Sequence, residues 1–442
     1  MGSYVPSNQE ERRQMLAAVG VADYADLFAA IPPQLAVDRL NLPPGLSELE
    51  VRQQVEELAG ENTVFKSCFR GAGAYRHFIP SIVNSVVNKE SFLTAYTPYQ
   101  AEISQGVLQS IFEFQTMICN LTGLDVANAS LYDGASAAAE AVSLCRERKR
   151  ARALVSAAAP PQVISAIRTY CFGNGMSVDL VPAPQGVTDP AALARLLRED
   201  VCCLYVQQPN YYGLLEDGAA LAAAAHQAGA RFILGLNPIA AALLPSAGEM
   251  QADVAVGEGQ PLGLPLSFGG PYLGFMAIKS DLLRRLPGRV VGETVDAQGR
   301  RAFVLTLQAR EQHIRREKAS SNICSNQALC ALTAAVYLAA MGPEGLAQAA
   351  RSCYAHAHYL ADGLAKLGFK LCYEGEFFHE FVTEGPLDPA RLEAALARQG
   401  ILCGLPLEGR RLLWCATELN SKTEMDRLLA VLAGLVKEEV AR

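Results

Sequence analysis

The sequence predicts an α/β fold, with a large domain built on a mostly parallel sheet and a smaller α/β domain after it. The main observation is an alternation of short apolar runs with helical patterns between residues 150 and 280. A second is a shorter series of strand and helix patterns after residue 368. A third is the composition of the 442 residues, since 50% are hydrophobic, which is ample for a sizeable core.

Six apolar runs predict the strands of the large domain: 153–156, 177–181, 203–206, 232–236, 254–256 and 273–278. Helical patterns at 161–171, 190–199 and 218–228 separate most of these runs. A long amphipathic helix is predicted over 102–121, and a second helix over 137–148 follows a turn. Strands that alternate with helices in this way form a largely parallel sheet with helices on both faces.

The C-terminal part predicts a long apolar helix from residue 328 to 341 and then a small α/β domain. Its predicted helices are 345–367, 388–398 and 421–438, and its predicted strands are 369–373, 380–383, 401–405 and 411–416. Residues 286–302 are polar and glycine-containing, which indicates a mobile loop or a hairpin. We therefore expect three parts: an N-terminal arm with site-facing loops (1–90), a large domain (91–335) and a small domain (336–442).

The first sixty residues predict two peripheral helices without a chemical motif. Ser7 and Glu10 have the spacing of a capping box for the first helix, and Ser47 begins the second. We expect this arm to pack on a neighbouring chain or on the main domain.

Charge and cysteine usage exclude several classes of function. A net charge of −7 argues against a nucleic-acid partner, and no apolar run of membrane length is expected. The twelve cysteines form no C-x-x-C pair, and the histidines complete no metal pattern, so no metal site is expected. Scattered cysteines without a leader sequence are typical of a reduced, cytoplasmic protein.

A glycine- and proline-rich stretch, Asp253–Phe275, joins two apolar strands. Pro261, Pro265 and Pro271 prevent a helix there, so the connection must be a loop. The glycines resemble a dinucleotide-binding motif only superficially, because that motif requires a helix after the glycines. A glycine-rich loop between buried strands is typical of a place where the backbone approaches a ligand or a partner chain.

Two loops, 68–80 and 94–106, concentrate Tyr, Arg, His and Gln in irregular sequence. Such loops commonly carry function. Our candidates are Arg76, His77, Tyr96, Tyr99, Gln100 and Glu102. The alternative for the two tyrosines is packing in an interface without a chemical part.

The segment 308–327 is the densest mixture of basic and amide side chains in the chain. Ser320–Asn322 disfavours a continuous helix, so a bend that faces something polar is expected. The basic candidates for a docking surface are Arg310, His313, Arg315, Arg316 and Lys318. The alternative is an internal network of ion pairs with Glu311 and Glu317.

The layout of an arm, a large α/β domain and a small α/β domain resembles the aspartate-aminotransferase-like (fold type I) pyridoxal phosphate enzymes. Such sites use a helix N-terminus for the phosphate, a carboxylate for the pyridine nitrogen and a lysine for the Schiff base. In this sequence Asp133 and Ser136 stand at the phosphate position, Leu234 at the carboxylate position, and Gln260-Pro261 at the lysine position. No lysine occurs between Lys149 and Lys279.

The whole chain resembles the glycine decarboxylase (P-protein) family of the glycine cleavage system, in particular subunit 1 of its two-subunit form. The segments that carry the resemblance are 97–106, 128–140, 257–263, 267–274, 312–319, 321–324 and 414–419. In that family a homologous subunit keeps the lysine and binds pyridoxal phosphate. The resemblance therefore implies that this chain binds no cofactor itself.

The resemblance implies an oxidoreductase assembly, a heterodimer paired again by two-fold symmetry. With subunit 2, the chain would decarboxylate glycine and transfer the aminomethyl group to the lipoyl group of H-protein, with reduction of the lipoyl disulfide. The loop candidates would face the partner's cofactor pocket, and the basic segment would lie near the path of the lipoyl arm. One alternative is a catalytically inert relative that acts as a regulatory or binding subunit. A self-sufficient enzyme that uses Lys279 is disfavoured, because this lysine stands at the far end of a strand.

Overall fold

The computed structural model describes residues 7–35, 37, 39–319, 321–323 and 325–441. The chain divides into two compact units, Met1–Val64 and Phe65–Arg442. The second unit begins inside the predicted arm, and a continuous helix crosses residue 335. The predicted boundaries at 90 and 335 therefore stay predictions.

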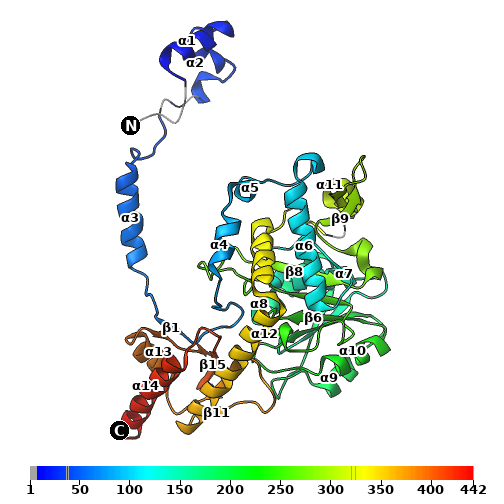
Figure 1. Cartoon of the computed structure of the whole chain (residues 1–442), viewed down its shortest axis with the longest axis vertical. Helices are drawn as coiled ribbons and strands as arrows, with labels where there is room; N and C mark the ends of the chain where they lie inside the picture. The colour runs from blue at the N-terminus through cyan, green and yellow to red at the C-terminus, as the bar shows by residue number, and fades with distance from the viewer. Residues whose placement is uncertain (1–6, 36, 38, 320, 324, 442) are drawn as a thin grey trace. The chain divides into compact units, whose positions relative to one another are not determined.

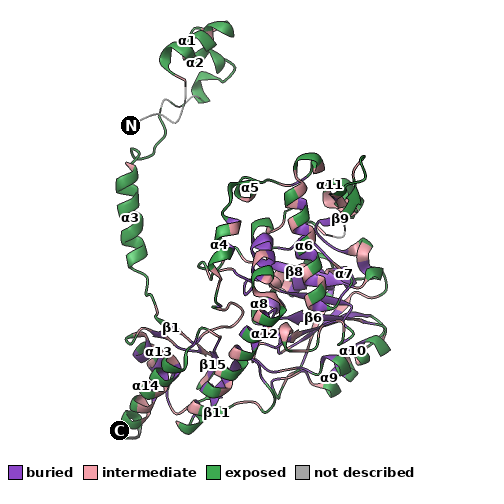
Figure 2. Cartoon of the chain, in the orientation of Figure 1, coloured by how far each residue is buried: buried purple, intermediate pink, exposed green. Residues whose placement is uncertain are grey.

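The first unit consists of the helices α1 (Gln9–Ala18), α2 (Tyr24–Leu27) and α3 (Glu48–Gly60) and the short turn η1 (Pro33–Leu35). Asn8 caps α1 by accepting from the amide of Glu11, whose carboxylate accepts from the amide of Asn8. The predicted cap at Ser7 and Glu10 is thus wrong by one residue. Ser47 and Glu50 form the same reciprocal cap on α3, as predicted. The described residues of these three helices are not buried (Figure 2).

The second unit is organised around a seven-stranded sheet of strand order β2-β8-β7-β6-β5-β3-β4 (Figure 1). Strands β3 to β7 are parallel, whereas β8 is antiparallel to β7 and β2 is antiparallel to β8. The bounds are β2 Val126–Ala127, β3 Arg152–Ser156, β4 Ser177–Val181, β5 Val201–Gln208, β6 Arg231–Leu236, β7 Val254–Glu258 and β8 Gly274–Ile278. All six predicted strands are present, and β2 was missed because it has only two residues.

The central strands are apolar throughout because helices cover both of their faces. On one face, Leu204 and Phe232 join a core with α6 (Gln105–Thr122), α10 (Gly218–Gln227) and the first part of α12. On the other face, Tyr205 and Ile233 join a core with α7 (Gly134–Cys145) and α8 (Pro161–Gly173). The short helix α9 (Pro190–Leu196) follows β4. The predicted large α/β domain is thereby confirmed.

The remaining connections of this unit are short. The helices α4 (Ser81–Val87) and α5 (Glu90–Leu93) precede α6, and the polar segment after residue 286 forms a hairpin of β9 (Val290–Val295) and β10 (Arg301–Thr306). Short turns follow at η5 (Gln308–Arg310), α11 (Gln312–Arg315) and η6 (Arg316–Lys318). The bend predicted at Ser320–Asn322 stays a prediction, because Ser320, like Cys324, lies outside the described residues.

Helix α12 (Ala328–Lys366) links this sheet to the C-terminal sheet. Gly342 has φ 60° and ψ 178°, and Pro343 follows, so α12 consists of two helices joined at a kink. By length and composition alone α12 could cross a membrane, contrary to the expectation that no such run exists. Its buried residues, such as Leu332 and Leu360, belong to the cores of the two sheets.

The C-terminal sheet has the antiparallel order β11-β12-β15-β14 and packs against α13 (Pro389–Ala397) and α14 (Lys422–Val440). Its strands are β11 Lys370–Leu371, β12 Glu380–Glu384, β14 Leu405–Pro406 and β15 Arg411–Cys415. The predicted strand 401–405 is wrong as a single element. Its first part, β13 (Ile401–Leu402), pairs in parallel with β1 (Ser67–Cys68) instead.

Candidate active site

A cavity of about 360 Å³ lies where the fold would hold a cofactor. Its walls are the loop 71–75, the start of α7, the ends of β6 and β7, and the residues 379–380 at the start of β12. Leu234 is buried in the core of the sheet, while Leu236 and Asn237 of the same segment line the cavity. The large and small sheets therefore both contribute to this site.

Two carboxylates occupy the N-terminus of α7. Asp133 accepts from the amide of Ser136 at 2.7 Å and caps the helix. Glu258, at the end of β7, accepts from the amides of Gly134, Gln260 and Leu273, each at 2.9 Å. Gly134 is required here, because a Cβ would lie 2.8 Å from the backbone nitrogen of Glu258.

These carboxylates differ from what a phosphate site requires. Burial raises the pKa of Glu258 to about 7, although three amide hydrogen bonds act to lower it. A phosphate would have to displace an acidic group from the helix N-terminus that normally attracts it. The residues at this position therefore do not fit the phosphate of pyridoxal phosphate.

Gln260 occupies the expected lysine position and is 1% exposed. Its Oε1 accepts from the amide of Tyr75 at 2.9 Å, and its Nε2 donates to the carbonyls of Tyr75 and Leu264 at 2.8 Å. Pro261, which follows, is also buried. Where a Schiff-base lysine would stand, the chain has a side chain that holds the loop 71–75 in place.

The six loop candidates separate into different environments. Five are exposed, with Tyr96 at 89% and Tyr99 at 54%: Arg76, Tyr96, Tyr99, Gln100 and Glu102. The hydroxyl of Tyr99 accepts from Nη2 of the buried Arg289 at 2.8 Å, and the guanidinium lies 5.2 Å from the centre of the ring.

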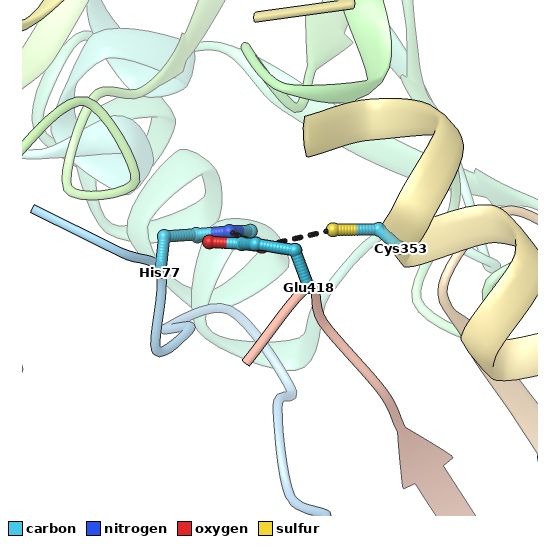
Figure 3. A group of neighbouring side chains, drawn as sticks. All are labelled: His77, Cys353 and Glu418. Atoms are coloured by element: carbon cyan, nitrogen blue, oxygen red, sulfur yellow. Dashed lines mark hydrogen bonds and ion pairs between the residues drawn. The ribbon is translucent and has the colours of Figure 1, made fainter. Parts of the chain in front are cut away.

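His77 belongs to a buried network with Glu418 and Cys353 (Figure 3). Glu418 Oε2 lies 2.8 Å from His77 Nδ1 and accepts from the Cys353 thiol at 3.2 Å, while Oε1 accepts from the amide of Phe78 at 2.6 Å. Burial acts to raise the pKa of Glu418, but the bonds from His77 and its neighbours lower this pKa to about 2.

This network was missed in the sequence, where the histidines completed no metal pattern. The three donor atoms lie within 4.8 Å of one another, a spacing that could hold a metal ion. These three side chains already hydrogen-bond to one another. They therefore also link the loop 76–78, α12 and the segment after β15. The expectation of no metal site stays a prediction.

A second pair of side chains connects the loop 71–75 to β12. Glu380 accepts from the amide of Ala72 at 2.6 Å and from the hydroxyl of Tyr75 at 2.7 Å. Burial raises the pKa of Glu380 to about 7. His379 is 1% exposed, its ring centre lies 4.6 Å from that of Tyr75, and neither ring nitrogen has a hydrogen-bond partner.

The basic candidates near residue 310 are also divided. Arg310 is partly buried and donates to the carbonyl of Leu286, and burial lowers its pKa. His313 lies 3.6 Å from a carboxylate oxygen of Glu311, a residue that the alternative interpretation names as a partner. The other three candidates are exposed: Arg315, Arg316 and Lys318.

The comparisons with known proteins agree on one family. The profile of the family "Glycine cleavage system P-protein" matches residues 2–432. A Moorella thermoacetica protein named "Probable glycine dehydrogenase (decarboxylating) subunit 1" is 50% identical over 98% of this chain and the whole of that protein.

Solved structures give the same result. A crystal structure of glycine decarboxylase (P-protein) of the glycine cleavage system, in inhibitor-bound form, has a TM-score of 0.93 at 43% identity, over 98% of this chain and 100% of the other. An aspartate aminotransferase from Thermus thermophilus has a TM-score of 0.60 at 16% identity, over 84% of this chain and 99% of the other. The second likeness concerns the fold alone and confirms the expected fold type.

Proposed function

This chain belongs to the glycine cleavage system P-protein family, and we propose from this premise that it acts as the cofactor-free subunit 1 of glycine dehydrogenase (decarboxylating). With a homologous subunit 2, it decarboxylates glycine and passes the aminomethyl group to the lipoyl group of H-protein. Pyridoxal phosphate, when bound to subunit 2, supplies the electron sink for loss of carbon dioxide.

The main support for this proposal is that acidic side chains occupy the helix N-terminus where the cofactor phosphate would bind. Asp133 and Glu258 already accept the amides at the start of α7. A phosphate at this position would have to displace both side chains from these amides and so lose the hydrogen bonds that they already make. That cost, together with Gln260-Pro261 in place of a lysine, disfavours both phosphate binding and covalent attachment in this chain.

The exposed side chains of the two loops support a role beside the partner's pocket. Arg76, Tyr96, Gln100 and Glu102 face away from the described core of this unit and are available to another chain. Tyr99 would contact the partner's pocket through its hydroxyl, which accepts a hydrogen bond from Arg289. His77 keeps the first loop in position through Glu418 rather than contacting substrate.

The exposed basic group Arg315, Arg316 and Lys318 supports a docking surface for an acidic, lipoyl-bearing H-protein. A basic patch speeds the encounter with an acidic partner, and the effect fades with salt. Further parts of the proposal are a cytoplasmic location and a heterotetramer, in which two heterodimers pair by two-fold symmetry.

Reconstitution tests the proposed function. Each subunit is purified alone, the two are mixed, and the exchange of glycine carboxyl with bicarbonate is measured with lipoylated H-protein. Exchange should require both subunits. If subunit 2 alone exchanges at the full rate and this chain only modulates it, the alternative of an inert regulatory subunit is correct.

A further inference from the structure

The cavity beside α7 has the composition of a site for a cation. Carboxylates of Asp133, Glu258 and Glu380 line it, and among the described residues no lysine or arginine does. An anion such as phosphate therefore finds no charge partner in this wall. A cation finds the carboxyl groups of all three residues, and it would favour the charged forms of Glu258 and Glu380, whose pKa values burial raises to about 7.

Aromatic rings strengthen this preference. Four tyrosines line the same cavity: Tyr75, Tyr205, Tyr211 and Tyr272. The electron-rich face of an aromatic ring attracts ammonium groups, and this attraction adds to that of carboxylates when the site is shielded from water. The apolar part of an alkyl chain would also pack against such rings.

His379 is a second observation that points to a ligand, because its ring nitrogens have no hydrogen-bond partner in the cavity wall. It lines the cavity, is 1% exposed, and has no partner for either ring nitrogen. Its burial lowers the pKa of the imidazole to about 3, so the ring is neutral and one nitrogen is a free acceptor. Buried acceptors without a donor are costly, and an N–H group would relieve that cost.

We propose that this cavity binds a small primary ammonium group, carried either by a free alkylamine or by a lysine side chain. The volume of about 360 Å³ lies within the range of small-ligand pockets. The site takes a ligand of the opposite charge to the cofactor phosphate that this fold usually holds.

Calorimetric titration of the complex with subunit 2 tests the proposal. The probes are n-butylammonium and Nα-acetyl-lysine-N-methylamide, and butanol and butyrate are the neutral and anionic controls. Saturable binding of butylammonium supports a free amine, and binding of the lysine probe alone supports a presented side chain. Equal binding of butyrate, or no binding of either ammonium probe, would overturn the proposal.

Gln162 offers a matched pair of variants, because it lines the cavity and is exposed on α8, and both variants lose the same weak hydrogen bond to the carbonyl of Ala72. Gln162→Glu should tighten ammonium binding about threefold or more, and Gln162→Lys should weaken it by a similar factor. Shifts in the same direction would contradict the charge argument.

His379→Phe replaces the imidazole with a somewhat larger aromatic ring and removes both unpartnered nitrogens. It should weaken ammonium binding and raise the melting temperature of the unliganded complex, because an unsatisfied buried group is lost. Unchanged ammonium affinity in this variant would contradict the role of His379. None of these readouts depends on glycine exchange, so this proposal and the proposed function can fail independently.

Discussion

Glu418 anchors the loop 76–78 to the C-terminal part of the chain, and its removal should destabilise the protein in a pH-dependent way. Its carboxylate is largely buried and meets His77, Cys353 and the amide of Phe78. Lowering its pKa from 4.5 to about 2 corresponds to about 3 kcal/mol of stability at neutral pH. For a unit of this size, that is about 4 °C in melting temperature.

The sign follows from the direction of the pKa shift. A group whose pKa is lower in the folded state contributes its full stability above the unfolded value of 4.5. The contribution is lost as the pH falls towards 2. The difference in unfolding free energy between wild type and Glu418→Gln should therefore be largest at pH 7 and should shrink steadily below pH 4.5.

The assay is thermal or urea unfolding of both proteins at pH 7, 5, 4 and 3. Glu199→Gln is a control, because this carboxylate is exposed and lies in a different part of the fold. A difference in unfolding free energy between wild type and Glu418→Gln that stays constant from pH 7 to pH 3 would refute the lowered pKa assigned to Glu418.

Three further predictions concern the site and the docking surface. Tyr99→Phe removes the acceptor of Arg289 and should lower glycine exchange by the reconstituted complex about tenfold or more, whereas unchanged kinetics would leave the ring as packing only. Gln260→Ala leaves two carbonyls and one amide without partners and should lower the melting temperature by several degrees, measured by calorimetry; an unchanged value would contradict the role of this side chain. Charge reversal of Arg315 and Arg316 should raise the KM for lipoylated H-protein at low salt and leave exchange with free lipoate unchanged, with Lys437→Glu as a surface control. Equal losses with both substrates would make that segment structural.

Strand positions were predictable because the central strands are buried on both faces and must be apolar. The runs at 177–181 and 232–236 match β4 and β6 to within one residue. Short elements were not predictable in this way. Strand β13 pairs with β1, more than 300 residues away, and no local pattern in residues 401–405 signals that partner.

The absence of a Schiff-base site was predictable from the sequence, because proline at position 261 has no side-chain amine that could form one. Contacts between distant segments were not predictable. His77 and Glu418 are 341 residues apart, and only the fold brings them together. Glu258 stood inside the glycine-rich stretch, yet its role depends on the amide of Gly134 at the start of α7. A signal was present, since Glu258 stands between two glycines at the end of a buried strand and needs hydrogen-bond donors there.

The central claim is that this chain is the cofactor-free half of a glycine decarboxylase, and borohydride labelling of the purified complex tests it most directly. After reduction in the presence of pyridoxal phosphate, both subunits are digested and their pyridoxyl peptides are identified by mass spectrometry. The account predicts a stoichiometric pyridoxyl-lysine on subunit 2 and none on this chain. A stoichiometric label on any lysine of this chain, Lys279 included, would contradict it.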